Sequence, residues 1–212
     1  MSLKLAGLHA ITPDEPRTEI LLRKTDQALR GGATVVQYRN KTADAALRKE
    51  QGRALAALCT KAGAIFIVND DVALALELGA DGAHLGATDG DLAEARRRLG
   101  NGRLLGASCY NCVELAEAAA QAGVDYVAFG SVFVSATKPA AVHAPLGIFA
   151  EARRRLALPL VAIGGITLQN APQVFAAGAD AVAVITALFD AEDIAARAAG
   201  FNQLHQQQRM QQ

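Results

Sequence analysis

The sequence of 212 residues predicts an α/β fold, specifically a single-domain (β/α)8 TIM barrel. Short apolar runs alternate strictly with Ala/Leu-rich helical stretches, and each kind occurs eight times. Glycine follows several of these helical stretches directly before the next apolar run, as in Gly79-Ala80-Asp81, Gly123-Val124-Asp125 and Gly178-Ala179-Asp180. The first unit has no G-x-G-x-x-G motif, which favours a closed barrel over an open doubly wound sheet.

The expected strands are short and apolar, as buried parallel strands are. They cover 8–11, 35–37, 64–68, 83–85, 104–107, 126–129, 160–163 and 181–185. The expected helices are rich in Ala, Leu, Arg and Glu. They cover 19–30, 45–62, 72–78, 92–99, 113–122, 147–156, 170–177 and 191–204. Residues 1–204 are therefore the predicted catalytic barrel domain, and the glutamine-rich residues 205–212 are expected to be a disordered polar tail.

Composition and charge narrow the class of function. The chain carries 21 basic and 21 acidic residues, and 51% of its residues are hydrophobic. A nucleic-acid-binding protein would show an excess of Lys and Arg, so no nucleic-acid partner is expected. The runs Arg96-Arg97-Arg98 and Arg153-Arg154-Arg155 are expected on solvated helix faces.

Several features favour a cytoplasmic location without a membrane partner. No apolar segment is long enough to cross a membrane, and the N-terminus lacks the basic and apolar stretches of a signal peptide. Three cysteines give no disulfide framework. Cys109 and Cys112 form a C-x-x-C, but a redox or zinc role would need a thioredoxin-like context or a second ligand pair. We interpret them as ordinary semi-buried thiols.

Polar residues gather where the predicted strands end, which is where barrels of this class carry their active sites. Gln37, Arg39 and Lys41 point to one face of the second strand, because side chains alternate along a strand. Arg and Lys are the side chains that bind phosphate, and a buried charge is costly unless it is paired. The alternative is an exposed strand end with solvated charges. Asn69 and Ser108 follow or end other strands, so the position favours an anion site.

Asp70 and Asp89 follow the third and fourth strands, so both carboxylates are expected at the same rim. Two oxygen donors together with substrate phosphates are the usual setting for Mg²⁺, which keeps several waters. Helix capping is the alternative, and Asp71 or Asp91 would serve that purpose equally well. The cationic residues nearby favour Mg²⁺ as the cofactor.

Two further loops indicate a second anion site. Gly164 and Gly165 follow the seventh strand, where barrels often bind phosphate through backbone N–H groups, and Thr186 follows the eighth. The other loop is rich in hydroxyl groups and contains Ser135, Ala136, Thr137 and Lys138. It is long enough to act as a lid, and an ordinary surface loop is the alternative.

Two anion sites at one mouth fit a substrate with phosphates at both ends, or two phosphorylated substrates that become joined. No nucleophile with an adjacent base is visible: apart from His9, no histidine lies at a clear strand end, and His84 lies inside a strand. Charge stabilisation of a leaving diphosphate is therefore the more economical interpretation.

Five motifs resemble, in order, those of the thiamine-phosphate synthase family. They extend from about residue 8 to residue 189, and each is moderately specific. The motifs are Gln37-Tyr38-Arg39-Asn40-Lys41, Val68-Asn69-Asp70, Gly82-Ala83-His84-Leu85-Gly86, Gly130-Ser131-Val132-Phe133 with Thr137-Lys138, and Val161-Ala162-Ile163-Gly164-Gly165-Ile166.

The resemblance implies a Mg²⁺-dependent transfer of a hydroxymethylpyrimidine group from its diphosphate to a thiazole phosphate, giving thiamine phosphate and diphosphate. In the family the diphosphate leaves first and the thiazole nitrogen traps a pyrimidine carbocation, so cations and a metal are needed rather than a base.

The family's site residues carry over to this sequence position by position. The pyrimidine diphosphate would be held by Gln37, Arg39, Lys41, Asn69, Ser108 and Lys138, of which Arg39, Lys41, Ser108 and Lys138 form the catalytic group. Mg²⁺ would be held by Asp70 and Asp89. The thiazole phosphate would be bound by Ser135, Thr137, Gly165, Ile185 and Thr186, and Tyr38, Asn40, Ala136 and Gly164 complete the substrate-binding motifs.

The chain departs from the family pattern at four positions. Ser135 stands where threonine is usual, Ala87 where glutamine is common, Tyr110 where histidine is common and His9 where tyrosine is frequent. These departures leave the diphosphate and metal residues intact but bear on the pyrimidine pocket and on turnover. Two alternatives stay open, a thiazole tautomerase-like isomerase and a non-catalytic barrel that binds thiazole phosphate or thiamine phosphate. Mg²⁺-dependent release of diphosphate distinguishes the synthase from both.

Overall fold

The computed structural model describes residues 5–134 and 142–210. The strands are β1 (Gly7–Ile11), β2 (Val35–Tyr38), β3 (Ile65–Asn69), β4 (Gly82–Leu85), β5 (Leu104–Tyr110), β6 (Tyr126–Phe129), β7 (Leu160–Ile163) and β8 (Ala181–Val184). The helices are α1 (Thr18–Arg30), α2 (Ala45–Ala62), α3 (Val72–Glu77), α4 (Leu92–Leu99), α5 (Val113–Gln121), α6 (Gly147–Arg155), α7 (Ala171–Ala176), α8 (Thr186–Phe189) and α9 (Ile194–Arg209). None of the helices in the described part of the chain combines the length and apolar character needed to cross a membrane.

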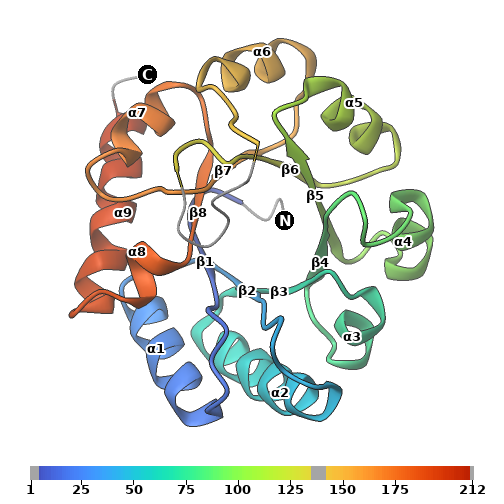
Figure 1. Cartoon of the computed structure of the whole chain (residues 1–212), viewed down its shortest axis with the longest axis vertical. Coiled ribbons are helices and arrows are strands. Elements are labelled where there is room, and N and C mark those ends of the chain that lie inside the picture. The colour runs from blue at the N-terminus through green and yellow to red at the C-terminus, as the bar shows by residue number, and fades with distance from the viewer. Residues whose placement is uncertain (1–4, 135–141, 211–212) are drawn as a thin grey trace.

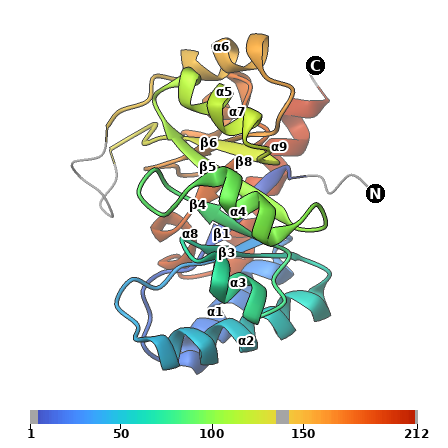
Figure 2. The same cartoon turned by 90° about the vertical axis from the view of Figure 1, so that its right-hand side faces the viewer.

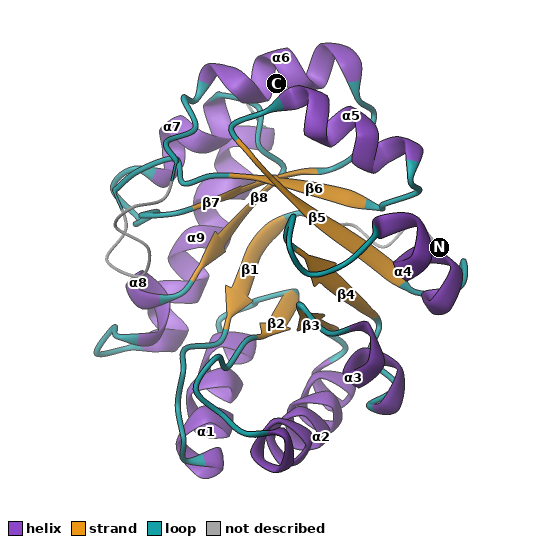
Figure 3. Cartoon of the chain, turned by 45° about the vertical axis from the view of Figure 1, so that its right-hand side comes forward, coloured by secondary structure: helices purple, strands orange, loops and turns teal. Residues whose placement is uncertain are grey.

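All strand pairs are parallel, and the strands close into a barrel in sequence order. Closure comes from β1 and β8, which place Gly7 opposite Ala181 and Ala10 opposite Val184. Figure 1 looks down this barrel, with the strands as an inner ring and the helices as an outer ring. Figure 2 shows the same layers from the side and Figure 3 from an oblique angle, with the helices packed outside the strands. The predicted single-domain (β/α)8 barrel is confirmed.

The observed elements follow the expected ones closely, with two exceptions. β5 extends to Tyr110 because it stays paired with β6 beyond a bulge between Ser108 and Tyr110, and Tyr110 lies opposite Phe129. The helix expected at 191–204 is α9, which begins at Ile194 and continues to Arg209, and the short helix α8 at Thr186–Phe189 was not expected.

The expectation of a disordered tail from residue 205 is wrong for the part of it that the structure describes. Helix α9 continues to Arg209. The His205 ring packs on Phe175 of α7, with ring centroids 5.2 Å apart. Asn202 donates hydrogen bonds to the carbonyl groups of Gly31 and Gly32. These contacts hold the helix against the barrel where the glutamine-rich segment begins, so composition alone was misleading there.

Alternate strand residues face two separate cores. One set, which includes Val36, Val68 and Phe129, packs against the helices. The other fills the barrel itself and includes Ile67 and Tyr126. The Tyr126 ring has room because Gly106 lies beside it, where an added Cβ would come within 2.1 Å of the ring. The barrel floor is therefore packed, and only its carboxyl end is left open.

A repeated aspartate fixes the amino ends of the strands. Asp81, Asp125 and Asp180 stand directly before β4, β6 and β8. In each case Oδ2 accepts a hydrogen bond of 2.7 Å from a backbone N–H near the start of the preceding strand. The repeated Gly-x-Asp of the sequence thus ties neighbouring strands together in pairs.

Arginines reinforce two of these aspartates. Arg96 pairs with Asp125 and also donates to the carbonyl groups of Gly100, Arg103 and Gly123. Arg153 Nη2 lies 2.5 Å from an oxygen of Asp180 in the same arrangement. The side chain of Arg96 is only 16% exposed. The expectation that the arginine triplets lie wholly on solvated helix faces is therefore wrong for Arg96.

The three cysteines are free thiols. Burial raises the pKa of both Cys59 and Cys109 to about 12, which makes them poor nucleophiles and metal ligands. Their placement agrees with the interpretation of ordinary thiols rather than a redox pair.

Candidate active site

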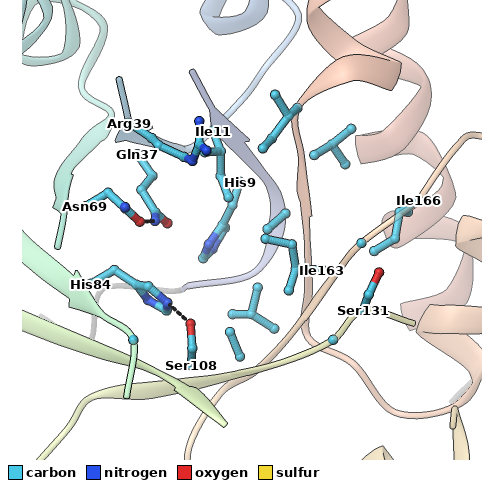
Figure 4. A pocket seen from close by; sticks show the side chains of 18 of the residues that line it. His9, Ile11, Gln37, Arg39, Asn69, His84, Ser108, Ser131, Ile163 and Ile166 are labelled. Atoms are coloured by element: carbon cyan, nitrogen blue, oxygen red, sulfur yellow. Dashed lines mark hydrogen bonds between the residues drawn. The ribbon is translucent and has the colours of Figure 1, made fainter. Parts of the chain in front are cut away.

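A pocket of about 410 Å³ opens at the carboxyl ends of the strands, and every strand contributes to its lining (Figure 4). Its two sides differ in chemistry. One side is polar and comes from β2 to β5, with Gln37, Asn69, His84 and Ser108. The other is apolar and comes from β1, β6, β7 and β8 with the residue that follows β8: Ile11, Ala128, Val161, Ile163, Ala183 and Ile185. Such a pocket suits a ligand with a polar edge and an apolar face.

An amide pair occupies the polar side of the pocket. Gln37 Nε2 donates to Asn69 Oδ1 at 2.5 Å, and Figure 4 shows this bond between the two neighbouring strands. The bond leaves Gln37 Oε1 as an acceptor and Asn69 Nδ2 as a donor with no other partner among the described residues. The two amides therefore present one acceptor and one donor side by side to a ligand.

Next to the amides, a hydrogen-bonded chain runs from Tyr126 through His84 to Ser108. His84 Nδ1 lies 3.1 Å from the Tyr126 hydroxyl, and Nε2 lies 2.9 Å from Ser108 Oγ. Burial raises the pKa of Tyr126, so its phenol keeps its proton. When Tyr126 donates to Nδ1, His84 donates to Ser108, whose own hydroxyl proton then points to a ligand.

His84 was not predicted to be a site residue, because it lies inside a strand. The structure places it in the pocket, since Ala83 and Leu85 on either side of it face the helices. That alternation was visible in the sequence and could have identified His84 as a pocket residue.

His9 lies low in the same pocket and is only 1% exposed. Its ring meets Tyr126 edge to face at 6.0 Å. Burial, with a smaller contribution from His84, lowers the pKa of His9 to about 3. The imidazole is therefore neutral at physiological pH, and Nε2 finds no hydrogen-bond partner among the residues that the structure describes.

Arg39 and Lys41 line the pocket together with Gln37, as the alternation along β2 predicted. Arg39 Nη1 lies 2.9 Å from both carboxylate oxygens of Asp14, and Lys41 Nζ lies 3.0 Å from Asp70 Oδ2. Asp14 also accepts a hydrogen bond of 2.7 Å from the backbone N–H of Lys41. Asp14 was missed by sequence reasoning, because it precedes Arg39 by 25 positions and belongs to no motif.

Tyr38 and Asn40 require a correction, because their side chains point away from the pocket. The Tyr38 hydroxyl donates to Gln51 Oε1 at 3.0 Å, and Asn40 Nδ2 donates to the same oxygen. Asn40 Oδ1 accepts from the backbone N–H groups of Thr42 and Ala43. Both residues thus shape the loop that carries the two cations, and neither lines the pocket.

Asp70 and Asp89 come together at the rim of the pocket. Asp70 has a left-handed backbone conformation, with φ of 63°, and its N–H donates to the carbonyl of His84 at 2.8 Å. Asp89 Oδ2 accepts from the N–H of Gly86 at 2.8 Å. Burial raises the pKa of Asp89, and the neighbouring Asp70 raises it further. Two neighbouring carboxylates at a rim, with the charge of Asp89 disfavoured in this way, form a natural site for a cation.

Helix capping was the alternative role for Asp70 and Asp89, but the neighbouring aspartates cap the helices instead. Asp71 accepts from the N–H of Leu74 and caps α3, and Asp91 accepts from the N–H of Glu94 and caps α4. The described residues contain no cluster of three His, Cys, Asp or Glu side chains that could hold a metal ion alone. The chemistry of the rim therefore fits Mg²⁺, which takes one or two carboxylates and completes its shell with phosphate oxygens and water.

The glycine pair after β7 lines the pocket and packs against the loop after β6. Both glycines have positive φ, 102° for Gly164 and 61° for Gly165. An added Cβ would lie 2.0 Å from Ser131 Oγ at position 164 and 2.3 Å from the Val134 carbonyl oxygen at position 165. Packing alone thus requires glycine at both positions.

The remaining predicted residues divide into two groups. Ile185 and Thr186 line the pocket after β8. The others lie outside the described residues: Ser135, Ala136, Thr137 and Lys138.

Comparisons with known proteins agree with one another. A family model described as thiamine monophosphate synthase matches residues 8–188. The chain is 58% identical over 201 residues to the thiamine-phosphate synthase of Aromatoleum aromaticum, covering 95% of this chain and 97% of that one. It is 53% identical over 196 residues to the protein of the same name from Thioalkalivibrio sulfidiphilus, covering 92% and 93%.

Solved structures give the same result. A thiamine phosphate pyrophosphorylase from Pyrococcus furiosus is 32% identical and superposes with a TM-score of 0.87, covering 97% of this chain and 98% of that one. A 3-hexulose-6-phosphate synthase at 19% identity, with a TM-score of 0.68 and coverage of 93% and 99%, shares the fold alone.

Proposed function

The chain belongs to the thiamine monophosphate synthase family, and from this premise we propose that it makes thiamine phosphate. The substrates are a hydroxymethylpyrimidine diphosphate and a thiazole phosphate, and the second product is diphosphate. The observation that carries the proposal is the meeting of Asp70 and Asp89 with Arg39 and Lys41 at the rim of a half-polar pocket. That arrangement suits a departing diphosphate next to a buried organic group.

The polar side of the pocket supports binding of the pyrimidine. Gln37 Oε1 and Asn69 Nδ2 offer an acceptor beside a donor, which complements the amino group and the ring nitrogen of an aminopyrimidine. Polar groups of a pocket that a ligand leaves unpaired discriminate against that ligand. The amide pair is therefore the proposed determinant of pyrimidine orientation.

The rim supports binding of the diphosphate. Asp70 and Asp89 are the residues that would hold Mg²⁺, and the ion would supply neutralisation of the charge that develops on the leaving diphosphate. Arg39 uses only Nη1 for Asp14 among the described contacts, so its other donors face no competing partner there. Lys41 and the Ser108 hydroxyl add further donors from the same side.

The proposed reaction needs no general base. The diphosphate leaves first, and the thiazole nitrogen attacks the resulting pyrimidine cation. His9, the buried histidine low in the pocket, is neutral at physiological pH and adds no positive charge there. The proposed thiazole phosphate site comprises the loops after β7 and β8, with Gly164, Gly165, Ile185 and Thr186. The roles of Ser135, Ala136, Thr137 and Lys138, and a cytoplasmic location, stay predictions.

The test is to incubate the purified protein with both substrates and Mg²⁺ and to quantify thiamine phosphate and diphosphate by mass spectrometry. We expect the two products in equal amounts, loss of both in EDTA, and a fall of roughly 100-fold or more in Arg39→Ala. The matched control is Arg30→Ala, since Arg30 forms an exposed ion pair within α1 and should not affect turnover.

Other outcomes would identify the alternatives. Isomerisation of the thiazole without diphosphate release would indicate a tautomerase-like enzyme. Binding of thiazole phosphate or thiamine phosphate without turnover would indicate a non-catalytic barrel.

A further inference from the structure

A second, smaller pocket of about 240 Å³ adjoins the rim of the active site. It lies where the end of β2, the first turn of α2 and the turn between β3 and α3 meet. Its lining comprises Tyr38, Arg39, Asn40, Lys41, Ala43, Arg48, Asn69, Asp70 and Asp71. Four of these residues, Arg39, Lys41, Asn69 and Asp70, also line the active-site pocket. The two pockets are therefore neighbours with a shared set of charged side chains.

Cations outnumber carboxylates in the lining of the smaller pocket. Three cations line it, Arg39, Lys41 and Arg48, against the two carboxylates of Asp70 and Asp71. Asp14, the partner of Arg39, does not contribute to this lining. Arg48 Nη2 lies 3.2 Å from Asp71 Oδ2, and the two side chains are 30% and 32% exposed. Each of the three cations thus has one carboxylate partner, and the donors that these partners do not use are available to an anion.

Arg48 is the one cation of the three that the active-site pocket does not share. It stands in the first turn of α2, beside the loop whose shape Asn40 fixes. No feature of the proposed reaction requires an arginine there, and its only described partner is Asp71. A guanidinium offers five donors in a planar fork, so one carboxylate leaves most of them available to a phosphate.

Occupation of the rim by a divalent cation would give this region an excess of positive charge. Lys41 is paired with Asp70 at 3.0 Å. If Asp70 instead binds Mg²⁺, Lys41 loses this partner, and the smaller pocket then presents three cations against the single carboxylate of Asp71. Anion affinity in this pocket would therefore be coupled to metal binding at the rim.

We propose that this pocket is an outer diphosphate site, in which Arg48 together with Arg39 and Lys41 receives the diphosphate product as it leaves the active site. The inference rests on the proposed function, because it takes diphosphate as the anion released at the rim. Arg39 and Lys41 belong to both pockets, so the anion can pass outward without losing contact with cations. Arg48 supplies the contact that draws it away from the reacting centre.

The structural alternative is that Arg48 and Asp71 only join α2 to α3. The two explanations predict different behaviour for Arg48→Gln and Asp71→Asn, because both variants break the same ion pair. Asn at position 71 still caps α3, so that helix keeps its N-terminal hydrogen bond. Arg53→Gln is a matched control, since Arg53 lies on the same helix and pairs with Glu77 of α3 outside both pockets.

The experiment is calorimetric titration of each purified protein with inorganic diphosphate in the presence of Mg²⁺. We expect Arg48→Gln to bind about tenfold more weakly than the wild type, Asp71→Asn to bind as tightly or more tightly, and Arg53→Gln to be unchanged. Thermal unfolding confirms that each variant is folded.

Equal weakening in Arg48→Gln and Asp71→Asn, or unchanged affinity in Arg48→Gln, would overturn the outer site and leave the proposed function intact. A wild-type protein that neither binds diphosphate nor forms thiamine phosphate would overturn both.

Discussion

The two ends of the barrel use the same side chains for opposite purposes. At the amino end, Asp81, Asp125 and Asp180 each accept a backbone N–H, and Asp125 and Asp180 also pair with an arginine. At the carboxyl end, Asp70 and Asp89 face each other. An aspartate surrounded by donors stabilises the fold. At the rim, Lys41 pairs with Asp70 and the N–H of Gly86 donates to Asp89, yet burial and the neighbouring Asp70 still raise the pKa of Asp89.

The surroundings of an aspartate therefore indicate whether it stabilises the fold or belongs to a candidate site. A carboxylate whose charge is disfavoured gains from a further positive partner, and Mg²⁺ is the partner that we propose at the rim. The difference leads to separate predictions for activity and for stability.

The largest effect is expected from Asp70→Asn. Turnover should fall roughly 100-fold or more, because one of two proposed metal ligands is lost, while the midpoint of thermal unfolding should not fall by more than a few degrees. Asn is chosen because it tolerates the left-handed backbone at this position, where φ is 63°. Steady-state kinetics and calorimetry on the same sample test both parts. Full activity in this variant would remove Asp70 from the metal site.

The reverse pattern is expected from Arg96→Ala at the amino end. The variant loses donors to Asp125 and to the carbonyl groups of Gly100 and Gly123, which should lower the free energy of unfolding by about 2 kcal/mol. Turnover at 25 °C should be unchanged, because Arg96 does not line the pocket.

The neighbouring residue on the same helix provides the control. Arg97 pairs only with Glu94, and its side chain is 72% exposed. Arg97→Ala should therefore change the free energy of unfolding by about 0.5 kcal/mol or less in chemical denaturation. Equal losses in the two variants would mean that the amino-end arginine is an ordinary surface residue.

A comparable or smaller effect is expected from the titration of His9, deep in the pocket between the two ends. The unfolded chain binds a proton on this residue near pH 6.5, whereas the folded chain does so only near a pKa of about 3. The unfolded state thus holds more protons between these values, and stability falls as the pH falls through this window. From pH 7 to pH 5 the loss should be about 2 kcal/mol.

His9→Phe should flatten this pH dependence, because phenylalanine has a similar shape and no titratable group. Denaturant titrations at several pH values measure the slopes. An unchanged slope in His9→Phe would show that the ring is accessible to protons in the folded state.

The barrel could be predicted from the sequence because each strand is a short apolar run and each helix is long or clearly bounded. The alternation along β2 also placed Gln37, Arg39 and Lys41 on one face, and the structure puts all three in the pocket. Asp70 and Asp89 lie close together, as expected, because parallel strands bring their carboxyl ends to one rim.

The contacts between distant segments could not be predicted in the same way. Asp14 pairs with Arg39 and Arg96 pairs with Asp125, and each partnership depends on how loops and helices pack around the barrel. Tyr38 and Asn40 were grouped with the ligand-binding residues because they lie inside the same motif. Their side chains instead hold the loop to Gln51 of α2, which a motif cannot show.

The proposed difference in role between the aspartates at the two ends of the barrel is tested most directly by a crystal structure of the protein with Mg²⁺ and diphosphate. We expect one ion bonded to both Asp70 and Asp89 at about 2.1 Å, with Lys41 turned from Asp70 to the diphosphate. Asp81, Asp125 and Asp180 should keep their backbone hydrogen bonds. An ion bound by the diphosphate and water alone, with Asp70 still paired to Lys41, would contradict the account.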